Sequence, residues 1–374
     1  MSAKPVSRAV LLVGSTVTCP DIEYATGFRA VDPVVFLRRG RERYLVVSTL
    51  EFGRAVRTCA GVKVFTPDGL GLSRRRRRRV GQWAAALCRR AGVRQVVVPG
   101  FFPLGVALRL KKKGIRVRVA EEPLFPEREV KRPDECRKIA EAQQAAVIAM
   151  RAAIAQISKA EVEGGYLQVG GRRLTSGDVR KTIMKVLFEQ ECTGREIIVA
   201  GGIQGADPHE LGDGPLRAGE AVVIDIFPQH QVHGYWGDLT RTVVKGAPTA
   251  TLRRMYVAVK AAQAAALNAV RPGAKCSSVH RAAADEFVRR GFVTETRKDR
   301  SVGFIHGTGH GVGLSIHEGP SLGRTEGRLR AGNVITVEPG LYYPEHGGVR
   351  IEDTIVVTRT GWRYLAPCEK KFQV

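Results

Sequence analysis

Two aspartates interrupt apolar, strand-like runs in residues 222–242, and they constrain this chain more than any other feature. Asp225 lies inside the run VVIDIF, and Asp238 comes directly before the run that begins at Leu239. Burying an ionised carboxylate is costly unless it is paired or coordinates a metal. We therefore expect the two acids to lie on neighbouring strands and to share a cation or a proton.

Histidines gather in the glycine-rich stretch FIHGTGHGVGLSIH, at His306, His310 and His317. Glycine lets the backbone approach closely and leaves neighbouring side chains open to a ligand. A stretch so rich in glycine is a poor helix, and we interpret its histidines as site residues. A fourth histidine, His209, lies in another glycine-rich loop.

Two more acids stand at apolar strands near the C-terminus. Glu338 ends the run VITV before Pro-Gly, and Glu352 lies in GVRIEDTIVV, which we predict to be one strand. Strict alternation of side chains places Arg350 and Glu352 on one face of that strand and Asp353 on the other.

Together these stretches offer four carboxylates and at least one imidazole to a single site. Four carboxylates would repel each other strongly, and two divalent cations would balance their charge. Carboxylates with one imidazole suit Mn, Co, Fe or Zn. Two such ions about 3.5–4 Å apart can activate one water, so the pattern indicates hydrolysis.

At these residues the chain resembles the M24 metallopeptidases of the pita-bread fold, such as methionine aminopeptidase, aminopeptidase P and prolidase. The resemblance implies two divalent metal ions, Mn foremost and Co, Fe or Zn as alternatives. The family's ordered ligand set falls on Asp225, Asp238, His310, Glu338 and Glu352. The resemblance further implies catalytic roles for His209, His317 and Glu338, and substrate contacts for His306 and Arg350, with Arg350 orienting the substrate or Glu352.

The resemblance covers about residues 130–374 and extends less specifically to the N-terminal part. That part and the RIED stretch are most similar to the Xaa-Pro members, aminopeptidase P (Xaa-Pro aminopeptidase) and prolidase (Xaa-Pro dipeptidase). It implies an α+β protein, with an α/β, ribonuclease H-like accessory domain at 1–127 and a pita-bread catalytic domain at 128–374. The implied activity is hydrolysis of the N-terminal Xaa-Pro bond of peptides or dipeptides, by a homodimer.

Local patterns predict the same division. Strand patterns at 9–13, 34–37, 44–47, 62–65, 95–98 and 116–119 alternate with helix patterns, which favours a helix-covered sheet. The polar residues 124–133, with two prolines, mark a boundary before a long helix with a small apolar face. Further helices are predicted at 179–191, 251–270 and 277–290.

One departure from the family concerns the spacing of the two aspartates, which is thirteen positions here and usually eleven. We expect residues 228–232 to lengthen a hairpin loop. His230 and His233 lie there as loop residues, and either could reach substrate. The departure also leaves open a small non-peptide substrate, as in creatinase or related lyases.

Composition limits the remaining alternatives. The net charge is +24, and residues 74–79 are six consecutive arginines, which we interpret as a solvated loop. A nucleic-acid-binding protein of this fold remains a lesser alternative, because all five ligands are kept. Seven scattered cysteines without a CxxC pair are typical of reduced thiols. No apolar run is long enough for a membrane span. We interpret the basic start with its short apolar run as a first strand rather than a signal peptide. We therefore expect a cytoplasmic protein.

Overall fold

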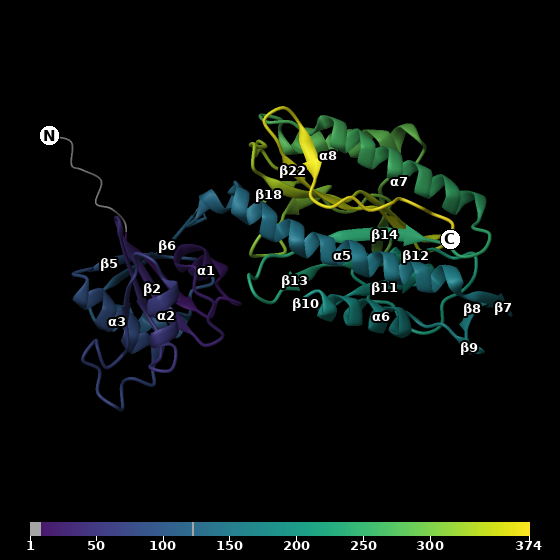
Figure 1. The fold of residues 1–374 in the computed structure, drawn as a ribbon. Coiled ribbons are helices and arrows are strands. Elements are labelled where there is room, and N and C mark those ends of the chain that lie inside the picture. Colours follow the sequence, from purple (N-terminus) through teal and green to yellow (C-terminus); the bar gives the residue numbers. More distant parts are fainter. Residues whose placement is uncertain (1–8, 122) are drawn as a thin grey trace. The chain divides into compact units, whose positions relative to one another are not determined.

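The computed structural model describes residues 9–121 and 123–374. The basic start at residues 1–8 lies outside the described residues. The chain divides into two compact units, unit 1 (Met1–Pro126) and unit 2 (Glu127–Val374), which Figure 1 colours from purple to yellow along the chain.

Unit 1 is built on one six-stranded sheet in the order β4-β3-β2-β1-β5-β6. The pairs β1–β2 and β2–β3 are antiparallel, and β3–β4, β1–β5 and β5–β6 are parallel. The strands are β1 (Ala9–Gly14), β2 (Val34–Arg39), β3 (Glu42–Val46), β4 (Lys63–Phe65), β5 (Gln95–Val98) and β6 (Arg116–Val119).

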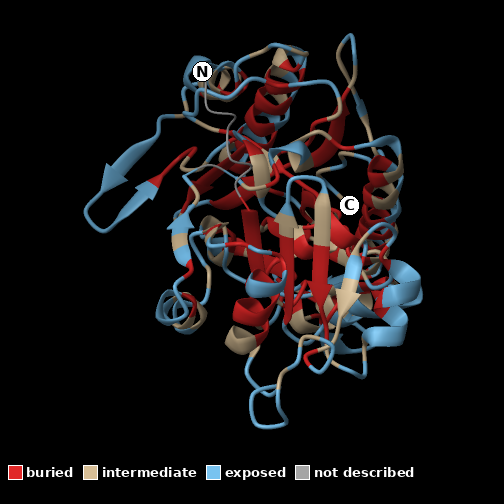
Figure 2. Ribbon diagram, turned by 90° about the vertical axis from the view of Figure 1, so that its left-hand side faces the viewer, coloured by how far each residue is buried: buried red, intermediate tan, exposed pale blue. Residues whose placement is uncertain are grey.

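Helices cover both faces of this sheet, which explains why its central strands read as continuous Val and Leu runs. One core joins the sheet to α3 (Val80–Arg90) and α4 (Leu104–Lys112). A second core joins it to α1 (Pro20–Thr26) and α2 (Phe52–Thr58). Figure 2 shows the central strands in red, as buried, with pale blue loops around them.

The first half of unit 2 packs two helices against a three-stranded antiparallel sheet, in the order β11-β12-β14. The small residues along α5 let this 27-residue helix lie close to the sheet. Its start is fixed by Glu135, which accepts a hydrogen bond from the Arg132 backbone N–H (2.8 Å). The elements are α5 (Pro133–Lys159), α6 (Ser176–Glu189), β11 (Ile198–Gly201), β12 (Val222–Ile226) and β14 (Leu239–Val243).

The second half of unit 2 packs two more helices against the other strands. Figure 1 shows α7 and α8 above the strands and α6 below them. The sheet order is β18-β17-β19-β22-β23, with a separate pair β20-β21. The elements are α7 (Ala250–Ala269), α8 (Cys276–Arg289), β17 (Gly309–Gly311), β18 (Glu318–Leu322), β19 (Val334–Val337), β20 (Gly340–Tyr343), β21 (Gly347–Arg350), β22 (Asp353–Val357) and β23 (Trp362–Tyr364).

Shorter elements connect these layers at the surface of unit 2. The 3₁₀ turns are η1 (Pro126–Glu129) and η2 (Gly202–Ala206), and the remaining short strands are β7 (Glu161–Glu163), β8 (Tyr166–Val169), β9 (Arg172–Arg173), β10 (Cys192–Gly194), β13 (Pro228–His230), β15 (Glu295–Arg297) and β16 (Arg300–Val302). None of the helices in the described part of the chain combines the length and apolar character of a membrane span. All seven cysteines are buried, and none of these described residues forms a disulfide bond.

Three local expectations differ from the structure. Residues 348–357 are not one strand: β21 ends at Arg350, β22 starts at Asp353, and the two belong to different sheets. The inserted residues are not a simple loop, because β13 pairs with β10. The helix expected from residue 179 begins at Ser176, because Thr175 accepts a hydrogen bond from the Asp178 backbone N–H (3.1 Å) and caps it.

Candidate metal centre

Five positions within or beside strands of unit 2 bring the sequence-predicted ligands to one place. Asp225 lies on β12, Asp238 directly before β14, His310 on β17, Glu338 directly after β19, and Glu352 between β21 and β22. All five line one cavity of about 900 Å³. The four carboxylates therefore come from both halves of the unit, although 127 positions separate the first from the last.

Asp225 meets an arginine from the other half. Arg350 donates from Nη2 to Asp225 Oδ2 (2.6 Å), and both side chains are buried. The second oxygen, Asp225 Oδ1, is buried without a hydrogen-bond partner. The Arg350 guanidinium also donates to Tyr342 Oη (2.9 Å). Arg350 thus orients an acid of the site, and it also lines the cavity.

Asp238 is fixed through its backbone by helix α5. Gln143 donates from Nε2 to the Asp238 carbonyl (2.9 Å) and accepts from the Asp238 N–H (2.7 Å). Thr354 donates a further hydrogen bond to the same carbonyl (2.8 Å). Gly237 makes the approach possible, because a Cβ there would lie 2.7 Å from the Ala142 backbone. The carboxylate is left to face the cavity.

His310 lies between two acids. Its Nε2 is 3.2 Å from Glu338 Oε1 and 3.5 Å from Asp238 Oδ2. A Cβ at Gly309 would lie 2.1 Å from the Thr336 carbonyl oxygen, and a Cβ at Gly311 equally close to that of Gly319. Glycine is therefore required on both sides of this histidine, which explains the composition of the stretch.

Glu352 and Asp353 point to opposite sides, as alternation predicted. Glu352 accepts at Oε2 from Thr240 Oγ1 (2.7 Å), and its Oε1 is buried without a hydrogen-bond partner. Asp353 accepts from Arg241 Nη2 (2.6 Å) and pairs with Lys370 Nζ (2.7 Å). The acid that lines the cavity is thus the one that keeps an oxygen without a hydrogen-bond partner.

Two carboxyl groups of the cluster, Asp238 and Glu352, have raised pKa values. Burial raises the pKa of Asp238 well above its usual range, and the neighbouring Asp225 raises it further. Burial and the charge of Asp238 raise the pKa of Glu352 in the same way. Both carboxyl groups therefore bind protons more tightly than exposed ones, and a cation would compete with those protons.

The pair of His310 and Glu338 behaves differently. Burial alone would lower the pKa of the imidazole, but the hydrogen bond and charge of Glu338 raise it to about 9. Burial alone would raise the pKa of Glu338, but His310 lowers it to about 2. Glu338 is therefore ionised, and His310 is the cation that balances it.

The other predicted site residues lie around the cavity. His209, His306 and His317 all line it, together with apolar side chains. Burial lowers the pKa values of His306 and His317, so both imidazoles are neutral near pH 7. The apolar lining residues are Ile198, Leu211, Phe227, Ile305 and Ile316. The cavity combines a polar floor with walls able to exclude water.

His230 in the inserted residues and the nearby His233 lie elsewhere. The rings of His230 and His233 are stacked 3.9 Å apart. His233 Nε2 is 3.2 Å from Glu141 Oε2 on α5. Neither histidine is among the described residues that line the cavity, so the structure does not place them at the substrate.

Sequence reasoning missed the residues that hold the acids in place. These are Gln143, Thr240, Arg241, Thr336 and Tyr342. One signal was available: in β14, Thr240, Arg241 and Thr242 are polar residues in a fully buried strand. Gln143 carries no such signal, because a single glutamine in a helix is ordinarily exposed.

The side chains present fit divalent cations. Ligand atoms of Asp238, His310 and Glu352 all lie within 4.8 Å of one another. Two buried carboxylate oxygens lack a hydrogen-bond partner. Oxygen-rich ligation with one imidazole is the donor set that Mn, Co, Fe and Zn accept. Among the four carboxylates, Asp225 is paired with Arg350 and Glu338 with His310. Asp238 and Glu352 are left without a countercharge of their own.

Comparison with known proteins places this geometry in a family. Residues 137–359 match the model of metallopeptidase family M24. The chain is 31% identical over 289 residues to a Xaa-Pro dipeptidase of Pyrococcus horikoshii, covering 75% of each chain. It is 37% identical over 201 residues to a Xaa-Pro dipeptidase of Pyrococcus furiosus, covering 51% of this chain and 54% of that one.

Solved structures agree with the sequence matches. The prolidase from Pyrococcus horikoshii superimposes with a TM-score of 0.81 at 27% identity, covering 98% of this chain and 95% of the other. The prolidase from Pyrococcus furiosus gives a TM-score of 0.80 at 25% identity, covering 97% of each. These matches confirm the α+β class, with an α/β unit followed by a pita-bread unit. This chain belongs to metallopeptidase family M24.

Proposed function

We propose that this chain is an exopeptidase that uses two divalent metal ions to hydrolyse the Xaa-Pro bond at the N-terminus of peptides or dipeptides. The observation that carries the proposal is the buried cluster of four carboxylates and one histidine on a cavity of about 900 Å³. The names of the relatives, Xaa-Pro dipeptidase and prolidase, support the substrate class.

In this proposal Asp225, Asp238, His310, Glu338 and Glu352 hold the ions. Two bound cations would supply an activated water and polarise the scissile carbonyl. Manganese is the ion we favour, with Co, Fe or Zn as alternatives. Asp238 and Glu352 have no countercharge of their own from the protein, which supports a role for both in holding the ions.

The remaining roles follow from protonation states. Glu338 is ionised and can accept at a carboxylate oxygen the proton that leaves the attacking water. His317 is neutral and can donate one N–H to the developing oxyanion, and His209 lies on the same cavity. His306 donates or accepts at Tyr342 Oη (2.9 Å), which fixes its ring at the cavity wall.

We assign catalysis to unit 2 and an accessory role to unit 1, and we propose a cytoplasmic homodimer. Sedimentation of the purified chain would test the dimer. A mass of a single chain across micromolar concentrations would contradict it.

A small peptide panel tests the activity. Ala-Pro, Ala-Pro-Ala and Ala-Ala should be assayed with Mn, Co and Zn, beside Asp238→Asn as an isosteric control. We expect cleavage of the proline peptides, little cleavage of Ala-Ala, and none by the variant. Cleavage of Ala-Pro-Ala identifies an aminopeptidase, and cleavage of Ala-Pro alone a dipeptidase. A metal-loaded, folded protein that cleaves neither would contradict the proposal and direct the search to small non-peptide substrates.

A further inference from the structure

Positive charge is distributed unevenly between the two units. Unit 1 contains 25 Lys and Arg against eight Asp and Glu, a net +17. Unit 2, with twice the length, has 35 against 28, a net +7. The excess charge of the chain therefore belongs mainly to the unit that contains none of the proposed catalytic residues.

Within unit 1 the excess lies in one segment, residues 69–120, which contains no acidic residue. Its fifteen basic residues are named here the basic face: Arg74, Arg75, Arg76, Arg77, Arg78, Arg79, Arg89, Arg90, Arg94, Arg109, Lys111, Lys112, Lys113, Arg116 and Arg118. All except the half-buried Arg109 are exposed. Among the residues that the structure describes, one of them forms an ion pair, Arg77 with Asp68 (2.9 Å).

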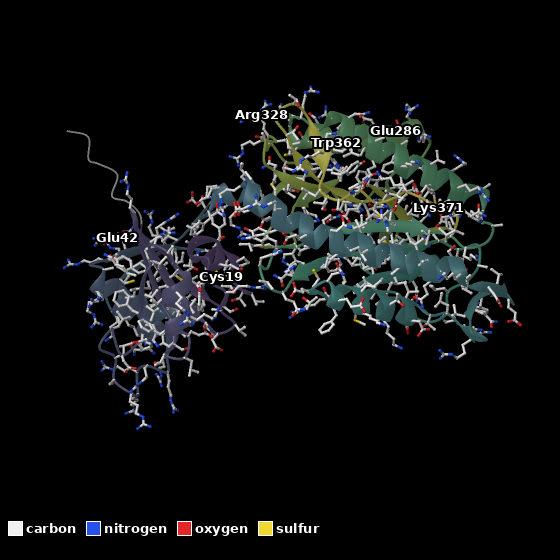
Figure 3. The ribbon with its side chains drawn as sticks, in the orientation of Figure 1. Cys19, Glu42, Glu286, Arg328, Trp362 and Lys371 are labelled. Atoms are coloured by element: carbon white, nitrogen blue, oxygen red, sulfur yellow. The ribbon has the colours of Figure 1, made fainter. Side chains whose placement is uncertain are left out.

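Packing connects the elements that carry these residues, although Arg116 and Arg118 point away from the α3–α4 side of the sheet, because Val117 between them packs into the core beneath those helices. The arginine run leads into α3 and is anchored there, because Trp83 Nε1 donates to the Arg77 carbonyl (2.8 Å). Gly81, in the first turn of α3, lies against α4, since a Cβ there would be 3.1 Å from Arg109 Cδ. The Arg116 N–H donates to the Arg94 carbonyl (2.9 Å), which brings the start of β6 beside the start of β5. Figure 3 shows many side chains of unit 1 that end in nitrogen, coloured blue, projecting into solvent.

We propose that the basic face binds a nucleic-acid strand through its phosphates. Twelve of the fifteen residues are arginine, whose planar guanidinium matches phosphate oxygens in pairs. The eleven-residue helix α3 begins beside the run, with no acid in its first turn, so its dipole adds to the attraction for anions. Phe101, 64% exposed before α4, offers a ring on which a base can stack.

A polyanionic strand fits this surface better than a lipid bilayer. A helix that lies on a membrane needs a broad apolar face, and α4 exposes only Leu104 and Leu108 over nine residues. The charges extend from a loop over two helices and an edge strand, which suits a repeating phosphate backbone. The inference does not depend on the proposed peptidase activity.

Salt-dependent binding of a labelled strand tests the proposal. The full chain is titrated into a fluorescein-labelled 20-nucleotide RNA at 50–200 mM salt, with anisotropy as the readout. The variant carries serine at residues 74–79, and thermal unfolding checks its fold. A matched control removes six exposed charges from unit 2: Lys185, Lys260, Arg271, Arg281, Arg359 and Lys371, of which Lys371 is labelled in Figure 3.

We expect the 74–79 variant to bind at least tenfold more weakly at 50 mM salt. The slope of log K against log salt should shrink by about 4, since about 0.7 counterions are released per phosphate contact on a single strand. The control should keep affinity and slope within about twofold. If the variant unfolds, serine at Lys111, Lys112 and Lys113 replaces it, with a slope change of about 2.

Two results would overturn the proposal. The first is no binding of RNA or the matching DNA strand by the native chain at 50 mM salt; sedimentation with vesicles that contain 30% phosphatidylglycerol would then identify a lipid surface as the ligand instead. The second is an equal loss in the unit 2 control, which would show a general effect of net charge.

Discussion

Glu352 and Asp353 are neighbours in sequence, both are buried, and they belong to two acidic clusters of opposite character. The carboxylate of Asp353 is fully satisfied: Arg241 and Lys370 supply charge, and Gln263 a hydrogen bond (3.1 Å). Glu352 accepts one hydrogen bond from the Thr240 hydroxyl group, and its other carboxylate oxygen has no hydrogen-bond partner. One cluster is neutralised by the chain itself, and the other requires something that the chain does not contain.

This contrast separates structural from functional acids more sharply than burial does, because the exposed fraction is 1% for both residues. A buried ion pair with complete hydrogen bonds holds a fold in register. A buried carboxylate cluster without its countercharge raises its own pKa values and remains ready for cations. Arg241 links the two clusters, because its guanidinium also donates to the Glu352 carbonyl.

The largest effect is expected from Glu352→Gln. The change removes one negative charge from the site but keeps the shape, so the metal-free protein should unfold at the same temperature or higher. Activity toward Ala-Pro should fall by about a thousandfold or more, because several kcal/mol of transition-state stabilisation depends on the ions. Steady-state kinetics and thermal unfolding measure the two effects. A variant with more than a tenth of native activity would contradict the assignment.

The corresponding change at the neighbouring acid, Asp353→Asn, should lower the stability of the fold and leave metal binding intact. It leaves Arg241 buried without its countercharge, and breaking such a pair costs about 3–5 kcal/mol of unfolding free energy. Urea unfolding should show this loss with and without added Mn. Thermal unfolding should still show stabilisation by Mn, since no proposed ligand is removed. Equal stability of the variant and the native protein would show that Asp353 does not stabilise the fold.

A smaller effect is expected from Thr240→Val, which keeps the shape of the side chain but removes the hydroxyl group that orients Glu352. Loss of a hydrogen bond behind a metal ligand lowers metal affinity about 10- to 100-fold. Calorimetric titration with Mn measures it. Thr358→Val, at a turn far along the chain, is the control. An unchanged Mn affinity would show that Thr240 does not position the ligand.

Much of this arrangement could be predicted from the sequence, for identifiable reasons. The Asp225 and Glu338 strands are apolar runs with one acid each, and the glycines around His310 exclude a helix. The break at Ile351 could not be predicted, because the run reads as one strand and only its pairing with two sheets divides it. The contact of Gln143 with Asp238 joins residues 95 positions apart and follows from helix packing alone.

The pH dependence of metal binding gives the finest test of the comparison. In the metal-free protein the pKa of His310 is raised to about 9, and those of Asp238 and Glu352 are raised as well. A group with a raised folded-state pKa stabilises the fold below its unfolded pKa, about 6.5 for histidine, and loses that contribution as pH rises through 9. A cation must displace the same proton, so Mn affinity should rise at least about tenfold per pH unit between 6.5 and 9. Titration in buffers of different ionisation enthalpy counts the protons released. In Asp353→Asn the rise should persist, because none of the proposed ligands is changed. A flat profile in the native chain would show that its acids are already ionised.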